Sequence, residues 1–207
     1  TNLVNEETMR QMIYHALYSW GQHTLLTFKE VWTVEDADIK ISFQKTDHFD
    51  SYPFDNKGGS LAHAFYPPDG RVHLDISEAD DWNDEKFLFR VLLHEFGHTL
   101  GLGHNPNMTK VDIMFPMYMD FLNELGPDDI AGIQFLYGSK ANHPTTTPIT
   151  TSIPTTKIPI LRTKSKKRKR SHKRRLHIRN QFKNQTILVK STSPIIFILN
   201  RGNVNIH

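Results

Sequence analysis

The pattern of apolar and polar positions predicts three helices in this chain. Residues 5–23 place apolar side chains three and four positions apart, which gives a helix one apolar face, and Asn5 is suited to cap its N-terminus. A second helix is predicted from residue 83 or 84 to residue 100, and a third from residue 127 to residue 138. The third begins with a proline and carries Asp128 and Asp129 in its first turn, where negative charge complements the helix dipole.

Short strands are predicted between the first two helices. Residues 37–43 alternate apolar Ile39, Ile41 and Phe43 with polar positions, which is the period of a strand, and residues 25–31 precede them with a similar pattern. Residues 47–70 are rich in Gly, Pro, Asp and His and are predicted to be mainly loop. Two further short strands are expected there, over residues 61–66 and 71–75.

The character of the chain changes after Gly138. Residues 1–139 hold 9 Lys and Arg against 22 Asp and Glu, a net charge of −13, whereas residues 140–207 hold 16 Lys and Arg and no acid, a net charge of +16. Residues 144–160 are dense in Thr and Pro, which is typical of a linker or a glycosylated stalk. The sequence therefore predicts a folded domain over residues 1–138, a linker over 139–163 and a basic, disordered tail over 164–207.

The basic cluster at residues 164–175 leaves three interpretations open. It is a solvated disordered segment, an anchor for a polyanion such as heparan sulfate, or a cleavage site for a processing protease.

The composition of the chain excludes cysteine chemistry and a membrane-spanning helix. The chain has no cysteine, so it has no disulfide, thiol nucleophile or thiolate metal ligand, and no apolar run approaches the roughly 18 to 20 residues of a membrane-spanning helix.

Residues 94–104, HEFGHTLGLGH, fit the pattern HExxHxxGxxH. On a helix, His94 and His98 share one face and can reach the same ion, while Gly101 lets the chain leave helical geometry so that His104 approaches from another side. Three neutral histidines leave one position on zinc open for water, which is typical of a catalytic site. Glu95 is then placed to take a proton from the zinc-bound water. The alternative, histidines that hold no metal, is disfavoured by the length of the pattern.

This motif and the residues after it resemble the metzincins, and in particular the catalytic domain of the matrix metalloproteinases. The resemblance implies an α+β fold with a twisted mixed sheet and three helices, and it places Met114 beneath the zinc as the Met-turn residue. It also implies an interior strand ahead of the first helix. Thr1 aligns just after that strand, so the first strand is expected to be missing here. The segments that carry the resemblance lie within residues 1–138: 52–55 (YPFD), 61–65 (LAHAF), 113–118 (IMFPMY) and 128–134 (DDIAGIQ).

The resemblance implies two further metal sites. Taken alone, the histidines between residues 48 and 73 are scattered over a loop region, and unrelated solvated histidines are the alternative. A structural zinc is implied at His48, Asp50, His63 and His73, a donor set that suits a closed tetrahedral site. A structural calcium is implied at the carboxylates of Asp55, Asp75 and Glu78 and the carbonyls of Asn56, Gly58 and Ser60. We therefore expect two Zn²⁺ and at least one Ca²⁺ per chain.

The resemblance also locates a substrate cleft. An extended substrate is expected to pair with an edge strand near residues 61–65, and the specificity pocket is expected to be walled by Pro116 and Tyr118. Arg90 precedes His94 by one helical turn on the same face, where a long side chain makes the pocket shallow. The alternative is that Arg90 swings out to solvent or pairs with an acid.

These observations predict a zinc-dependent metalloendopeptidase that is secreted, monomeric and active on extracellular-matrix proteins. Cleavage is expected to proceed by Glu-assisted attack of zinc-bound water. The alternative hypothesis is a catalytically incompetent fragment, or a protein that keeps the fold and binds matrix or polyanions. The intact zinc motif with Glu95 favours the enzyme.

Overall fold

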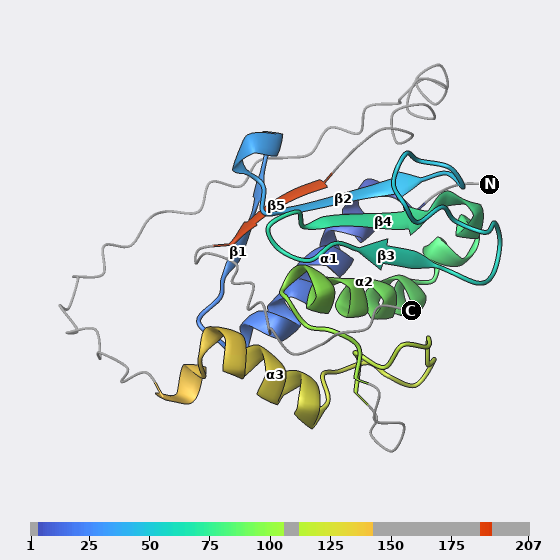
Figure 1. Ribbon diagram of the computed structural model, residues 1–207. Helices are drawn as coiled ribbons and strands as arrows, with labels where there is room; N and C mark the ends of the chain where they lie inside the picture. The colour runs from blue at the N-terminus through green and yellow to red at the C-terminus, as the bar shows by residue number, and fades with distance from the viewer. Residues whose placement is uncertain (1–3, 106–111, 143–186, 192–207) are drawn as a thin grey trace, which may run out of the picture.

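The computed structural model describes residues 4–105, 112–142 and 187–191 (Figure 1). Its first helix, α1 (Glu6–Gly21), begins after Asn5, whose side chain accepts a hydrogen bond from the Thr8 N–H. This bond satisfies one of the amides that a helix start leaves unpaired. The predicted N-cap and the predicted apolar face are both confirmed. The buried residues of that face are Met9, Met12, Ile13, Ala16, Leu17 and Trp20.

A single mixed sheet contains β1 (Phe28–Val31), β2 (Ile39–Gln44), β3 (Ala62–Ala64), β4 (Arg71–Asp75) and β5 (Ile187–Ser191). The strands lie in the order β1-β5-β2-β4-β3. β2 and β4 are parallel, β3 is antiparallel to β4 and forms one edge of the sheet, and β5 is antiparallel to both of its neighbours. The predicted mixed sheet and α+β class are therefore confirmed.

The second helix, α2 (Glu85–Thr99), packs against α1 on one face of the sheet, and α3 (Pro127–Tyr137) lies beyond α2, farther from the sheet (Figure 1). Asp84 caps α2 by accepting hydrogen bonds from the N–H groups of Lys86 and Phe87. The α3 helix starts at the predicted proline and is followed by Gly138, whose φ of 75° stops the helix. Short 3-10 helices complete the fold: η1 (Val34–Asp36), η2 (Ile76–Glu78), η3 (Asp81–Asn83) and η4 (Lys140–Asn142).

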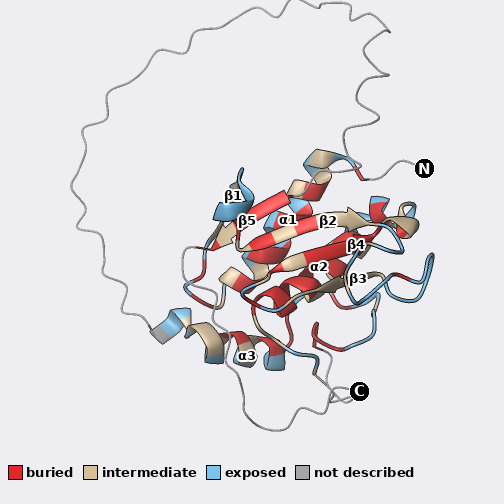
Figure 2. Ribbon diagram, turned by 45° about the horizontal axis from the view of Figure 1, so that its top comes forward, coloured by how far each residue is buried: buried red, intermediate tan, exposed pale blue. Residues whose placement is uncertain are grey.

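The core lies between the sheet and the helix pair, where the buried faces of the strands and helices meet (Figure 2). Trp20 is fully buried there, and its indole N–H donates a hydrogen bond to the Leu93 carbonyl at 3.0 Å. This contact fixes α2 against α1, and α2 carries the HExxH residues. No helix in the described part of the chain is both long and apolar enough to cross a membrane.

One part of the predicted tail is ordered. Within residues 164–207, residues 187–191 form β5, which corrects the prediction of disorder for these five residues. Among the described strands, β5 lies in the interior of the sheet, between β1 and β2. Most of the predicted linker and the basic cluster at residues 164–175 lie outside the described residues.

Candidate active site and metal centres

The zinc-motif histidines are positioned by α2 and by the turn that follows it. His94 and His98 lie one helical turn apart, with Gly97 between them. A Cβ at Gly97 would lie 2.2 Å from the Met114 sulfur, so glycine is what allows the loop carrying Met114 to approach the helix. After the helix ends, Gly101 adopts a φ of 97°, a conformation that favours glycine, and the chain turns so that His104 meets the other two histidines.

The three imidazoles converge on one point. The Nε2 atom of His104 lies 3.1 Å from the Nε2 of His94 and 3.1 Å from the Nε2 of His98. The Nδ1 atoms point away: that of His94 lies 2.6 Å from the Ile113 carbonyl and that of His98 lies 2.8 Å from the Leu102 carbonyl. A carbonyl oxygen can only accept a hydrogen bond, so in both neutral rings Nδ1 carries the proton and Nε2 carries the lone pair.

This arrangement fits a tetrahedral zinc ion. Zinc–nitrogen bonds of about 2.0 to 2.1 Å place neighbouring ligand nitrogens roughly 3.3 Å apart, close to the spacing of these Nε2 atoms. Burial lowers the pKa of His94 to about 4 and that of His98 to about 3, and it also lowers the pKa of His104. The histidines are therefore neutral at physiological pH, which is the form that binds a metal.

Glu95 is the buried acid of this site. It follows His94 on α2 and lines the same cleft as the three histidines. Burial raises its pKa to about 8, and its Oε2 atom has no hydrogen-bond partner among the described residues. A buried carboxylate oxygen without a partner is costly, so this atom is suited to accept a proton or a hydrogen bond from a molecule in the cleft.

The loop under the histidines is held by a residue whose role the sequence did not reveal. The Asp129 carboxylate accepts hydrogen bonds from the N–H groups of Ile113 at 2.6 Å, Met114 at 3.1 Å and Gly126 at 2.8 Å. Ile113 is the residue whose carbonyl orients His94. The position of Asp129 in the first turn of α3 predicted only an interaction with the helix dipole, because its partners lie in segments that only the tertiary fold brings together.

Asn105 contributes to the same support. Its side-chain amide donates to the buried Asp112 carboxylate at 2.9 Å, and its backbone N–H donates to the Met114 carbonyl at 2.8 Å. These two bonds join the histidine turn to the loop that carries Met114.

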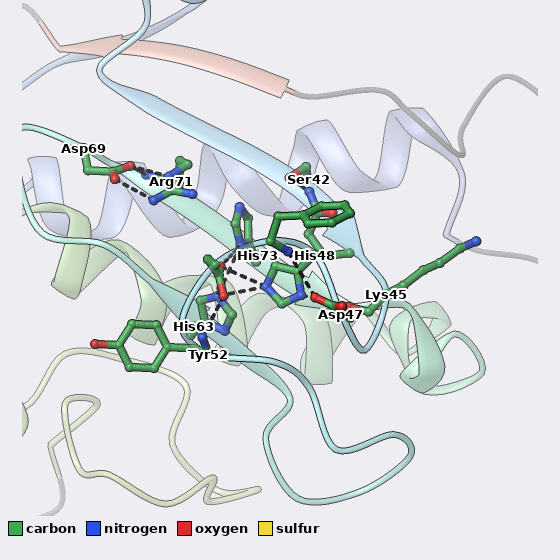
Figure 3. Close-up of polar contacts among 12 residues, drawn as sticks. Ser42, Lys45, Asp47, His48, Tyr52, His63, Asp69, Arg71 and His73 are labelled. Carbon is green, nitrogen blue, oxygen red and sulfur yellow. Dashed lines mark hydrogen bonds and ion pairs between the residues drawn. The ribbon is translucent and has the colours of Figure 1, made fainter. Parts of the chain in front are cut away.

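A second cluster brings together His48, His63 and His73 (Figure 3), whose rings surround the carboxylate of Asp50. A single oxygen, Oδ2, lies 2.9 Å from the Nε2 of His48, 3.0 Å from the Nε2 of His63 and 2.9 Å from the Nδ1 of His73. His63 on β3 and His73 on β4 are directly opposite each other in the strand register, and the loop after β2 supplies the other two residues. The structure thus brings together all four residues predicted for the structural zinc.

The charges of this second cluster also suit a metal. Burial lowers the pKa of His73 to about 4, and it lowers the pKa of His63 as well. Burial alone would raise the pKa of Asp50, but hydrogen bonds from the Tyr52 N–H and from His63 outweigh it and bring this pKa to about 2. Neutral histidines and an ionised carboxylate are the protonation states that zinc requires.

The residues predicted for calcium are only partly assembled. The Asp55 carboxylate accepts from the Ser60 N–H at 3.1 Å, and Glu78 accepts from the Gly58 N–H. Within the described residues, only the two histidine clusters bring three or more ligand atoms within 4.8 Å of one another, so Asp55, Asp75 and Glu78 do not form such a group. Burial and the nearby Asp81 and Asp75 raise the pKa of Glu78, and Asp75 Oδ2 is buried without a partner.

A cleft of about 570 Å³ runs past the three histidines. One wall is the edge strand β3, and the opposite wall is the loop that carries Pro116 and Tyr118. Arg90 on α2 lines the cleft, and its side chain reaches the loop that carries Tyr118 and Leu122. Its Nε donates to the Leu122 carbonyl at 3.1 Å, and one terminal nitrogen donates to the Tyr118 hydroxyl at 3.0 Å. A third bond joins Nε to the Asn123 side chain at 3.0 Å.

Comparison with known proteins agrees with this geometry. The sequence model of the matrixin family matches residues 1–138. The chain is 41% identical over 151 residues to the hatching enzyme of Paracentrotus lividus, covering 71% of this chain and 25% of that protein. It is 42% identical over 141 residues to human matrix metalloproteinase-26, covering 65% and 53%, and 41% identical over 152 residues to bovine interstitial collagenase, covering 70% and 31%. The chain thus spans between a quarter and about half of the length of these relatives.

Proposed function

The chain belongs to the matrixin family of zinc metalloendopeptidases, and we propose that His94, His98 and His104 hold its catalytic zinc while Glu95 acts as the general base. One observation carries this assignment. Three Nε2 atoms converge in the same cleft as a buried carboxylate that lacks a partner. No other group of His, Asp and Glu in the described residues combines an open cleft with an unpaired acid.

The proposed chemistry divides between the metal and the protein. Zinc at such a site supplies a Lewis acid, which makes a water molecule nucleophilic near neutral pH. Glu95 accepts the proton of the attacking water and then delivers it to the nitrogen of the leaving amine. Burial raises the pKa of Glu95, which strengthens this carboxylate as a proton acceptor. The Ile113 and Leu102 carbonyls hold His94 and His98 in the required tautomer.

We propose that the substrate is an extended polypeptide. Among the described strands β3 pairs only with β4, and its residues line the cleft, so its other edge is available to a strand of substrate. The side chain after the scissile bond then enters the pocket between α2 and the wall formed by Pro116 and Tyr118, with Arg90 at its far end. Backbone pairing tolerates many sequences, so selectivity rests mainly on this pocket.

We further propose that the enzyme is a secreted monomer that acts on extracellular-matrix proteins. Support comes from the names of its relatives, which include an interstitial collagenase and a hatching enzyme. A second zinc at Asp50 and its three histidines, and a calcium near Asp75 and Glu78, are proposed as structural ions. Heparan sulfate is the proposed ligand of the basic tail, on charge alone.

The role of Glu95 is tested with a fluorogenic peptide substrate and the full chain. Glu95→Gln keeps the size of the side chain but removes the base, so kcat/KM should fall roughly 10²- to 10⁴-fold while the zinc content stays unchanged. Glu85→Gln, in the exposed first turn of the same helix, is the matched control and should keep full activity. Near wild-type activity in Glu95→Gln would remove Glu95 from the mechanism.

A further inference from the structure

Tyr66 reaches across the cleft from the sheet to the histidines. It follows the last residue of β3 by two positions, lines the cleft and is 42% exposed. Its ring meets the His98 ring edge to face, with the ring centroids 5.7 Å apart and an angle of 85° between the planes. Its hydroxyl lies 3.6 Å from the position that a Cβ on Gly103 would take, in the turn that carries His104. Tyr66 therefore forms a wall of the cleft beside the proposed zinc site.

The turn that carries Tyr66 is held in place by its own polar contacts. The Tyr66 carbonyl accepts a hydrogen bond from the Asp69 N–H at 3.1 Å. The Asp69 carboxylate accepts two bonds from the Arg71 guanidinium, at 2.7 and 2.8 Å, and the Asp69 carbonyl accepts one from the Lys40 ammonium at 2.8 Å. Because these bonds fix the backbone of the turn, the ring of Tyr66 is positioned before any substrate arrives.

Tyr66 and Arg90 lie on opposite sides of the zinc-binding histidines. Along α2, Arg90 is one turn before His94 and His98 is one turn after it, so the Cα atoms of Arg90 and His98 are roughly 12 Å apart. Tyr66 contacts the His98 end of this row. If the residue after the scissile bond enters the pocket at Arg90, as the proposed function requires, the residues before that bond pass Tyr66.

We propose that Tyr66 is a specificity-determining residue, and that its ring packs against an apolar side chain directly before the scissile bond. This inference rests on the proposed function. The neighbours of the ring in the cleft, Ala64 and the neutral His98, carry no charge. An apolar side chain that covers the exposed part of the ring removes apolar area from water, whereas an ionised one loses hydration there and gains no charged partner from these two neighbours.

Peptide hydrolysis by the full chain tests the proposal. Peptides with Leu or Gly directly before the scissile bond are compared, and mass spectrometry identifies the bond that is cut. The wild type should prefer Leu, and Tyr66→Ala should reduce the Leu-to-Gly ratio of kcat/KM roughly 10-fold, the lower end for an apolar contact because the ring is half exposed. Tyr66→Phe keeps the ring and should keep this ratio within about twofold. Should Tyr66→Ala fail to fold, Tyr66→Gln removes the ring at similar bulk and carries the same expectation.

Controls separate substrate contact from a general disturbance of the site. Tyr14→Ala removes an equally exposed tyrosine on α1, outside the cleft, and should leave both the ratio and the rate unchanged. In Tyr66→Ala, the zinc content and the preference for the residue after the scissile bond should also stay as in the wild type. An unchanged Leu-to-Gly ratio, or an equal change of preference on both sides of the scissile bond, overturns the proposal.

A binding assay keeps this inference separate from the proposed catalysis. Fluorescence anisotropy measures the Kd of the labelled Leu and Gly peptides for Glu95→Gln and for Glu95→Gln/Tyr66→Ala, neither of which needs to cleave them. If the wild type hydrolyses no peptide, the proposed function fails, but a preference for the Leu peptide that disappears with Tyr66 still supports the role of this residue. The same ratio of Kd values in both variants, or no binding of either peptide, contradicts it.

Discussion

The proposed specificity pocket depends on how one side chain, Arg90, is held. Its guanidinium is joined by hydrogen bonds to Leu122, Asn123 and Tyr118, which belong to the loop opposite α2. Arg90 does not extend freely into solvent, because these contacts hold its side chain against the loop from Tyr118 to Asn123. Moving Arg90 aside for a large substrate group therefore requires breaking hydrogen bonds to a charged donor, which are stronger than neutral ones.

Arg90→Leu is predicted to change the preference of the enzyme for the residue after the scissile bond. The shorter side chain leaves space at the end of the pocket and releases the loop at Leu122, so peptides with long aromatic groups should gain roughly 10- to 200-fold in relative kcat/KM. Profiling a peptide library on both proteins measures this. Lys86→Leu, one turn earlier and exposed on α2, is the control. Coinciding profiles for Arg90→Leu and wild type would assign pocket depth to the loop alone.

Sequence spacing predicted the members of the first histidine cluster, and the family resemblance implied those of the second, but neither revealed the contacts that support the site. The pattern from His94 to His104 encodes its own geometry, because helical spacing and one glycine are enough to bring the three rings together. The bonds made by Arg90 and Asp129 could not be derived in this way, since each reaches a segment far away in the sequence. Such contacts follow from tertiary packing, which local periodicity does not describe.

At the scale of elements, hydrogen bonds from the loop Asp112–Phe115 join the turn after α2 to the start of α3. Asp129, at the start of α3, accepts three backbone N–H groups, and two of them come from this loop. Asp112 in turn accepts from the Asp128 N–H at 3.1 Å and from the Asn105 side chain. The first turn of α3 therefore fixes the position of the loop whose Ile113 carbonyl contacts His94.

Asp129→Asn is predicted to weaken both folding and catalysis. An amide has only one acceptor oxygen, and its NH₂ group would face backbone donors, so the free energy of unfolding should drop by about 2 to 3 kcal/mol and the melting temperature by roughly 5 to 10 °C. Activity should fall as well, because the Ile113 carbonyl would no longer hold His94 in place. Thermal unfolding and peptide hydrolysis test this, with the exposed Asp120→Asn as control. An unchanged melting temperature would contradict the role of Asp129.

The elements differ in how far the sequence could predict them. The three helices follow from apolar spacing and from their caps, Asn5, Asp84 and Pro127, all of which act within a few residues. β5 could not be predicted, because five residues inside a basic region carry too short a pattern to distinguish a strand from a disordered segment. Its stability comes from β1 and β2, more than 140 residues earlier in the chain.

For the molecule as a whole, the two histidine clusters connect different parts of the fold. The first belongs to α2 and the turn after it, and it opens to the cleft. The second joins β3, β4 and the loop after β2, so an ion there would tie the edge strand that lines the cleft to the interior of the sheet. A ligand that binds only the folded state adds its binding free energy to stability, about 4 kcal/mol when its concentration is a thousand times its Kd.

The purified full chain is accordingly predicted to hold two zinc ions, and the clusters should lose them separately. His63→Gln should leave one zinc and a protein that melts roughly 8 to 16 °C lower, because about 4 kcal/mol of metal binding is lost. His98→Gln should also leave one zinc but abolish peptide hydrolysis, since His98 belongs to the three histidines that line the cleft. His15→Gln, exposed on α1, is the matched control and should keep both ions. Elemental analysis, thermal unfolding and peptide hydrolysis on the same samples separate the two sites. One zinc in an active wild-type sample, or two in His63→Gln, would rule out the second centre.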